Sequence, residues 1–256
     1  MDNLKLKDLI NKQSIVLTDA QLKQFDKYYE LLIEWNTFMN LTAITQYDEV
    51  LVKHFADSLA IKPAIDALSK IDSDICQVLD LEQGIHVIDV GTGAGFPGLP
   101  IKIAFEKCHV KLLDSLNKRV QFLNEVITKS GIADVEAVHS RAEDAGRDAR
   151  MREQYDLGVS RAVSNLSTLS EYVLPFVKIG GYFVAYKSGE IEKEVDHSKK
   201  AIKILGGQVK HIYKFCLPDT DIERSFVFIK KIHNTPKKYP RKAGIPSKEP
   251  IDNREM

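Results

Sequence analysis

Residues 86–98 of the 256-residue chain read HVIDVGTGAGFPG. Residues 86–90 form a short run rich in β-branched side chains, which is typical of a buried strand. Glycines follow at positions 91, 93 and 95, and the sequence from Leu99 onward is compatible with a helix. Glycines let the backbone turn tightly and approach a ligand, and a following helix N-terminus offers free N–H groups. We therefore expect a ligand site where this strand ends.

Segments with strand and helix patterns alternate after this loop. Four more strands are expected at 110–115, 135–140, 155–162 and 180–188, with helices between them at 99–106, 118–130 and 166–177. Beyond an amphipathic stretch, two final strands at 208–215 and 225–232 have no helix between them, which indicates an antiparallel hairpin at a sheet edge. The pattern predicts an α/β fold in which a seven-stranded, mostly parallel sheet carries helices on both faces.

The sequence before this core is expected to be helical. Thr18 and Gln21 have the spacing of a capping box at a helix start. An apolar stripe at helical spacing follows and consists of Leu22, Phe25, Tyr29, Leu32 and Met39. A second helix is predicted over 48–60, ending near Pro63, and a short helix and loop over 66–84.

Basic residues are concentrated at the C-terminus. The chain has 36 basic and 36 acidic residues, but residues 230–256 carry eight basic and three acidic ones, so this segment is +5 and the remainder −5. The segment holds four of the nine prolines and has no apolar period. We therefore divide the chain into a helical extension (1–80), an α/β core (81–233) and an extended basic tail (234–256). The tail suits a flexible arm on RNA phosphates, and a solvated tail that aids solubility is the alternative.

Several classes of protein are excluded by composition. No stretch approaches eighteen consecutive apolar residues, and the first residues lack the apolar run of a secretory signal. The three cysteines are far apart, without metal-binding or disulfide spacing, and the histidines form no HxxxH or HExxH pattern. We expect a cytoplasmic protein without a metal site. No sustained heptad appears, which favours a monomer.

The glycine spacing admits two kinds of nucleotide-cofactor site. Counted from Gly93, the run Gly-x-Gly-x-x-Gly has the form of the dinucleotide fingerprint, with Asp114 near the expected acidic position. That match starts two residues into the loop. In addition, a helical segment precedes the strand at 86–90, whereas dinucleotide domains often begin with that strand. A glycine turn that merely packs strand against helix is a third possibility.

Counted from Asp89, the sequence Asp-x-Gly-x-Gly-x-Gly fits the pattern that binds S-adenosylmethionine better. In this interpretation Asp89, Gly91, Gly93 and Gly95 form the cofactor loop. Asp114, at the end of the second strand, would accept hydrogen bonds from both ribose hydroxyls, since a carboxylate has two acceptor oxygens and a vicinal diol two donors.

Motifs along nearly the whole chain resemble those of the RsmG (GidB) family of bacterial small-subunit rRNA methyltransferases. They are WNTFMNLTAI (35–44), VKHFADSLA (52–60), DVGTGAGFPGLP (89–100), LLDSLNKRVQFL (112–123), HSRAED (139–144), SRAVSNL (160–166) and the tail TPKKYPRKAGIPSKEPI (235–251). Only residues 66–83 look longer than in compact members. The resemblance implies a class I methyltransferase fold and transfer of a methyl group from S-adenosylmethionine to N7 of guanine 527 in 16S rRNA. The RNA partner would be naked 16S rRNA or the 30S subunit.

The resemblance also implies particular contacts. Cofactor contacts would fall on Gly91 and Phe96, on Ala142 and Glu143 where the adenine ring is held, and on Arg161. Arg161 also follows a strand at its carboxyl end, where such sheets place ligands, and a surface salt bridge is the alternative. As further residues acting in catalysis we name Lys187, which could touch guanine O6 or a phosphate, and Arg141. A solvated loop lysine is an equally good interpretation of Lys187.

The predicted chemistry needs no general base, because guanine N7 already carries an in-plane lone pair. Rate enhancement would come from alignment and electrostatic support. The chain lacks the Asn/Asp/Ser-Pro-Pro-aromatic motif used on exocyclic amines and a Pro-Cys motif for attack on pyrimidines. Two rival classes remain, namely a nicotinamide-dependent oxidoreductase and an RNA-binding assembly factor without turnover.

Other notable residues are expected to be structural. Phe25, Tyr29 and Trp35 lie at helical spacing, which favours core packing over a base-stacking platform. His54 is expected to form a local hydrogen bond, and Asp57-Ser58 either a cap or part of the pocket wall. Deleting residues 234–256 is expected to weaken RNA binding without changing cofactor affinity.

Overall fold

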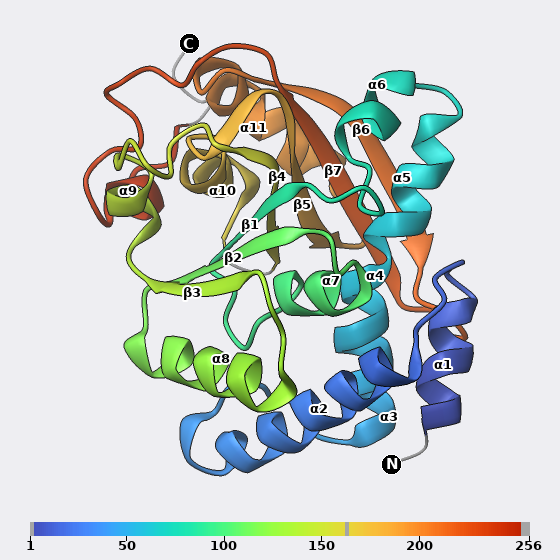
Figure 1. Ribbon diagram of the computed structural model, residues 1–256. Coiled ribbons are helices and arrows are strands. Elements are labelled where there is room, and N and C mark those ends of the chain that lie inside the picture. The colour runs from blue at the N-terminus through green and yellow to red at the C-terminus, as the bar shows by residue number, and fades with distance from the viewer. Residues whose placement is uncertain (1–2, 162–163, 252–256) are drawn as a thin grey trace.

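The seven predicted strands form one sheet in a computed structural model, which describes residues 3–161 and 164–251. The strands are β1 (His86–Val90), β2 (His109–Asp114), β3 (Val135–His139), β4 (Tyr155–Arg161), β5 (Val177–Ser188), β6 (Gly207–Cys216) and β7 (Glu223–Lys231). Their order is β3-β2-β1-β4-β5-β7-β6, with β1 to β5 parallel (Figure 1). Strand β7 is antiparallel to both β5 and β6, so the predicted hairpin lies at the sheet edge. The predicted fold class is confirmed.

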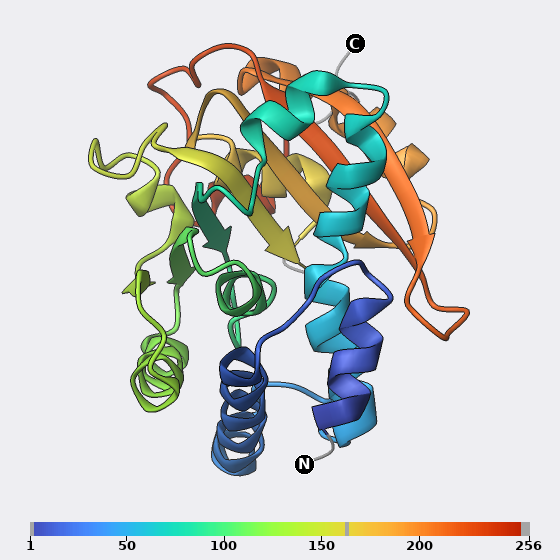
Figure 2. The same ribbon diagram turned by 45° about the vertical axis from the view of Figure 1, so that its right-hand side comes forward.

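Alternate residues of the strands enter two separate apolar cores, one on each face of the sheet. Val87 and Leu112 pack with the N-terminal helices, α7 (Gly98–Ala104) and α8 (Asn117–Ser130). Ile88 and Leu113 pack with α10 (Leu166–Val173) and α11 (Glu192–Ile204) on the other face. Figures 1 and 2 show helices on both faces of the sheet. This explains why the central strands β1 and β2 are largely buried and apolar.

The N-terminal helices pack on the sheet through one of these cores. Helix α1 (Asn3–Asn11) precedes α2 (Asp19–Met39), which begins at the predicted capping box of Thr18 and Gln21. Phe25 is fully buried, as predicted, and Tyr29 and Trp35 pack partly buried against the same core. The α2 residue that reaches the glycine loop is Tyr28, whose hydroxyl donates to the Ala94 carbonyl.

The second helical segment is longer than predicted. It runs through α3 (Tyr47–Val50), a π-helical segment η1 (Leu51–Ala56), α4 (Asp57–Leu59) and α5 (Ile61–Ser69), and α6 (Ser73–Val78) follows. The predicted end near Pro63 is wrong, because Pro63 lies in the first turn of α5, where its missing N–H leaves no intrahelical hydrogen bond unmade. None of the described helices is both long and apolar enough to span a membrane.

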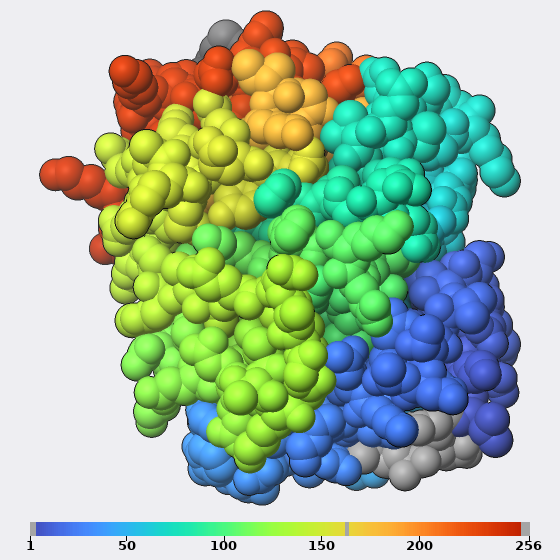
Figure 3. Space-filling view, viewed as in Figure 1, coloured from blue at the N-terminus to red at the C-terminus, as the bar shows by residue number. Residues whose placement is uncertain are grey.

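The described part of the tail is not a free arm. Residues 235–251 lie along the body of the protein and include a short helix, α12 (Ile245–Lys248), beside α9 (Ala142–Ala145) (Figures 1 and 3). The Arg152 guanidinium donates to the carbonyls of Thr235 and Tyr239 at 2.6 and 3.0 Å. The expectation of a flexible arm is therefore wrong for this segment. Hydrogen bonds and the buried Tyr239 hold it to the body, and these contacts leave no apolar period in the sequence. Residues 252–256 lie outside the described residues.

Candidate functional site

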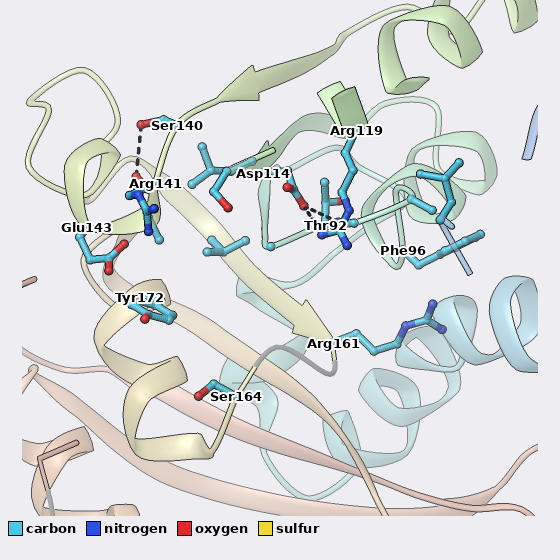
Figure 4. Close-up of a pocket in the computed structure, with 18 of the residues that line it drawn as sticks. Thr92, Phe96, Asp114, Arg119, Ser140, Arg141, Glu143, Arg161, Ser164 and Tyr172 are labelled. Atoms are coloured by element: carbon cyan, nitrogen blue, oxygen red, sulfur yellow. Dashed lines mark hydrogen bonds and ion pairs between the residues drawn. The ribbon is translucent and has the colours of Figure 1, made fainter. Parts of the chain in front are cut away.

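A pocket of about 600 Å³ opens at the carboxyl ends of β1, β2 and β4 (Figure 4). Strand order reverses between β1 and β4, and open α/β sheets bind ligands at such a point. Its walls come from the glycine loop, the end of β2, the start of α9, the end of β4 and the tail. The predicted residues that line it are Gly91, Gly93, Phe96, Asp114, Arg141, Ala142, Glu143 and Arg161. The pocket therefore gathers residues from Leu41 to Ser247, which are up to 206 positions apart in the sequence.

Asp89 holds the glycine loop from behind and does not line this pocket. It is fully buried, and its Oδ2 accepts hydrogen bonds from Thr92 Oγ1 at 2.7 Å and from the Gly98 amide at 2.8 Å. Burial raises the pKa of the Asp89 carboxyl to about 7, against the stabilising effect of these two hydrogen bonds. The structure assigns Asp89 to positioning the loop, in place of the predicted direct contact.

The loop glycines have different surroundings. Gly91 and Gly93 have φ of +72° and +62°, and both line the pocket. A Cβ on Gly93 would meet nothing within 4 Å, whereas a Cβ on Gly95 would lie 2.6 Å from the Tyr28 hydroxyl. Gly95 is thus required by the close approach of α2 and is not part of the pocket lining, which differs from the prediction.

Asp114 connects the glycine loop to the end of β2. Its Oδ2 accepts from the Gly93 amide and its Oδ1 from the Leu116 amide, both at 2.9 Å, and Arg119 lies 3.4 Å from Oδ2. Each carboxylate oxygen has two lone pairs, so Oδ1 can accept a second hydrogen bond, and Oδ2 can accept one in place of the 3.4 Å contact with Arg119. Asp114 can therefore accept from a vicinal diol in the pocket, as predicted for the ribose.

One end of the pocket is built by α9, α10 and the tail. Glu143 is 5% exposed, and its Oε1 accepts from the Gly244 amide at 2.8 Å. Arg141 and Tyr172 line the same end (Figure 4), and Ala142, which precedes Glu143 in α9, also lines the pocket. The sequence analysis missed Tyr172, Gly244 and Ser247 as lining residues. For Gly244 and Ser247 the sequence signal was the tail motif, which was interpreted as a flexible arm that contacts RNA.

Arg161 lies at the other end of the pocket. Its guanidinium donates to Asp57 Oδ2 at 2.8 Å and to the Lys53 carbonyl at 3.1 Å, and it lies 5.0 Å above the Phe96 ring. With a side chain only 16% exposed, Arg161 forms a partly buried ion pair rather than the surface salt bridge considered above.

His54 stacks on Phe96 with ring centroids 4.5 Å apart. Burial, followed by repulsion from Arg161, lowers the pKa of His54 to about 3. The imidazole is therefore neutral near pH 7, where it bonds Thr42 Oγ1 through Nε2 at 2.8 Å. The prediction of a local hydrogen bond for His54 is confirmed, and the residue also forms part of the pocket wall.

A second pocket of about 610 Å³ adjoins the first and shares His54 and Arg161 with it. Asp57 lines this second pocket and pairs with Arg161 and with Arg224, whose Nε lies 3.2 Å from Asp57 Oδ1. Lys187 also lies here and donates to Glu194 Oε1 and to the Ser164 carbonyl, both at 2.7 Å. Lys187 is therefore an ion-paired residue of the second pocket, outside the first.

Comparison with known proteins distinguishes between the two cofactor interpretations of the glycine loop. The family model described as "rRNA small subunit methyltransferase G", GidB, matches residues 21–224. "Ribosomal RNA small subunit methyltransferase G" of Lachnoclostridium phytofermentans is 48% identical over 92% of this chain and 91% of that protein. The protein of the same name from Alkaliphilus metalliredigens is 49% identical over 96% of this chain and 97% of its own length.

Among solved structures, that of M. jannaschii TYW2 in complex with AdoMet has a TM-score of 0.48 and 14% sequence identity, covering 63% of this chain and 76% of that one. The family match decides between the two interpretations of the glycine loop in favour of a methyltransferase. The family model matches most of the chain, and these relatives are nearly half identical over more than nine-tenths of it. The chain therefore belongs to the family of rRNA small subunit methyltransferase G, as its motifs indicated.

Proposed function

We propose that this enzyme transfers a methyl group from S-adenosylmethionine to N7 of guanine 527 in 16S rRNA. The observation that carries the proposal is the first pocket, in which Asp114 and Glu143 stand at positions suited to a nucleoside and Arg161 borders a second pocket. When bound, S-adenosylmethionine supplies an electrophilic methyl group on its sulfonium.

The residues of the first pocket fit this cofactor. The Asp114 oxygens are oriented by two backbone amides. Oδ1 has a lone pair for one ribose hydroxyl, and Oδ2 would accept the other in place of the 3.4 Å contact with Arg119. Glu143 and Tyr172 flank the end assigned to the adenine ring (Figure 4). The open side of Gly93 leaves room for close backbone approach. The amino-acid end of the cofactor would then lie toward Phe96 and Arg161.

The chain's own residues act by positioning and by electrostatics. N7 of guanine attacks through its lone pair, so no side chain has to remove a proton. Asp57 is held by Arg161 and Arg224, and His54 has a low pKa, which agrees with a reaction that needs no general base at this end. Rate enhancement then comes from aligning N7 with the methyl carbon and from electrostatic support.

The second pocket is the proposed entrance for the guanine. Arg161 borders both pockets, so it is the residue we assign to the reacting centre. Lys187 and Arg224 line the second pocket and suit guanine O6 or a phosphate, although Glu194 partly neutralises Lys187. Arg141, at the Glu143 end, is proposed as a contact to RNA phosphate.

Cofactor and substrate class can be tested together. S-adenosylmethionine and NADH are titrated into the protein, and labelled methyl transfer is measured on 16S rRNA and on 30S subunits that lack the modification. We expect saturable binding of S-adenosylmethionine only, and label in RNA. Binding of NADH would favour the oxidoreductase class, and cofactor binding without label in either RNA substrate would favour the assembly factor.

A further inference from the structure

Several polar side chains outside the sheet are committed to holding the tail. Glu171 is 1% exposed and forms a fork with Arg241, at 3.0 Å from Nε and 2.7 Å from Nη2, and it also accepts from the Arg241 amide. Arg147 donates to the Pro240 carbonyl at 2.6 Å, and Thr168 to the Pro246 carbonyl at 3.0 Å. Side chains from α10 and from the segment before β4 thus fix the tail backbone at many points.

This anchored tail ends at the cofactor pocket. Three residues after Arg241, the Gly244 amide donates to Glu143 Oε1 at 2.8 Å. Gly244 has φ of +82°, a conformation in which glycine aims its amide at no steric cost. Gly244 and Ser247 line the same end of the pocket as Tyr172. The tail therefore forms one wall of the pocket and orients one carboxylate in it.

We propose that residues 241–247 of the tail are part of the cofactor site, with the Gly244 amide as the positioning group for Glu143. Held through one oxygen, Glu143 presents its second oxygen to a hydrogen-bond donor of the ligand, such as an exocyclic amine. This inference rests on the proposed function, because it identifies the ligand as S-adenosylmethionine. It also reverses the expectation that the tail leaves cofactor affinity unchanged.

The tail lies beyond the part of the chain that the family model matches, which ends at residue 224, although relatives align with 92% and 96% of the chain. In the structure residues 241–247 contact positions 143 and 171, which lie inside the matched part. The tail thus completes a site whose other walls come from the matched core.

The test is the dissociation constant of S-adenosylmethionine measured calorimetrically without RNA. The double variant Glu171→Gln/Arg241→Gln weakens the anchor without leaving a buried charge or changing the net charge. We expect its dissociation constant to rise about tenfold, equivalent to about 1.4 kcal/mol. The control, Asp148→Asn/Arg150→Gln, removes a similar pair whose arginine is 89% exposed, and should stay within about twofold.

An unchanged dissociation constant in the anchor variant, with cooperative unfolding retained, would overturn the inference. If that variant fails to fold, hydrogen exchange of the wild-type tail provides a second test. By reciprocity, saturating S-adenosylmethionine must slow exchange in residues 241–247 if the tail belongs to the site. Equal exchange rates with and without cofactor would contradict it. Failure of the wild-type protein to bind the cofactor would instead overturn the proposed function.

Discussion

Gly93 and Gly95 lie two positions apart in one loop and both have positive φ. The φ of +62° at Gly93 lies in the left-handed region, where alanine carries a strain of about 1–2 kcal/mol, whereas the φ of +101° at Gly95 lies outside it and strains alanine at least as much. Their surroundings differ, because only at Gly95 would the new methyl group meet Tyr28 and Leu123 at under 3 Å. We expect Gly95→Ala to lose roughly 2–5 kcal/mol of unfolding free energy through strain and overpacking. Gly93→Ala should lose about 1–2 kcal/mol but weaken S-adenosylmethionine binding about tenfold. Urea denaturation and cofactor titration measure both quantities, and equal stability of the two variants would refute this assignment.

Asp89 predicts a pH dependence of stability. The pKa of the Asp89 carboxyl is about 7 in the folded state and lies above the ordinary value of 3.8. Between these two pH values the folded state therefore binds the proton more tightly than the unfolded state. Its stabilising contribution is complete below about pH 4 and is lost as pH rises through 7. This loss amounts to at most about 3 kcal/mol between pH 5 and 8. Asp89→Asn should remove it.

We therefore compare the melting temperature of Asp89→Asn with that of the wild type, both without ligand. The difference, variant minus wild type, should be larger at pH 8 than at pH 5. The control is Asp148→Asn, because Arg150 lowers the pKa of the Asp148 carboxyl to about 2, outside this window. A difference between Asp89→Asn and wild type that is the same at both pH values would show that Asp89 does not titrate there.

The residue roles were only partly predictable from the sequence. Gly91, Gly93 and Asp114 could be placed, because a glycine turn after β1 and an acidic residue at the end of β2 meet at one sheet edge in any fold of this type. The different roles of Gly93 and Gly95, and the position of Asp89 outside the pocket lining, depend on what α2 and α7 pack against. Such contacts join residues far apart in the chain, and no local pattern reports them.

At the scale of elements, the helical run from α3 to α5 places Asp57 between β4 and β7. Asp57 is 4% exposed and pairs with Arg161 and Arg224. Asp57→Asn would leave two partly buried guanidiniums without a charged partner, so we expect a loss of about 2–4 kcal/mol in unfolding free energy. Methyl transfer should also fall, because Arg161 loses its charged acceptor at this end.

The control for this variant is Asp66→Asn in α5. Asp66 pairs with Lys62 one turn away and is 46% exposed, so its loss should cost under about 1 kcal/mol. Urea denaturation compares the two variants directly. A similar, small effect of both would mean that the Asp57 pairs do not hold these elements together.

The elements themselves were predicted most accurately where burial dictates the sequence. The apolar strand at 86–90 has the predicted bounds, because a parallel strand between two cores admits few polar residues. The four-residue α9 was not predicted, since so short a helix has no period to detect. The continuation through Pro63 was missed because proline signals a helix end only outside the first turn.

At the scale of the whole molecule, the charge asymmetry has a structural explanation. The basic tail packs along the body through Glu171, Arg147 and Arg152, so part of its charge serves attachment rather than RNA contact. Exposed Lys237 and Lys238 remain at the surface, where they can approach phosphate. Composition alone could identify the basic tail, but only its buried partners distinguish a docked segment from a free arm.

The proposed methylation of one guanine N7 is tested by mapping the position of the transferred methyl group. The protein is incubated with S-adenosylmethionine and with 30S subunits or 16S rRNA lacking the modification, and the product RNA is reduced with borohydride and cleaved with aniline at 7-methylguanosine. We predict cleavage at guanine 527 alone, and none with the Arg161→Ala variant at equal cofactor occupancy. Transfer to another base or another atom would contradict the proposed reaction, and full transfer by Arg161→Ala would contradict the role assigned to Arg161.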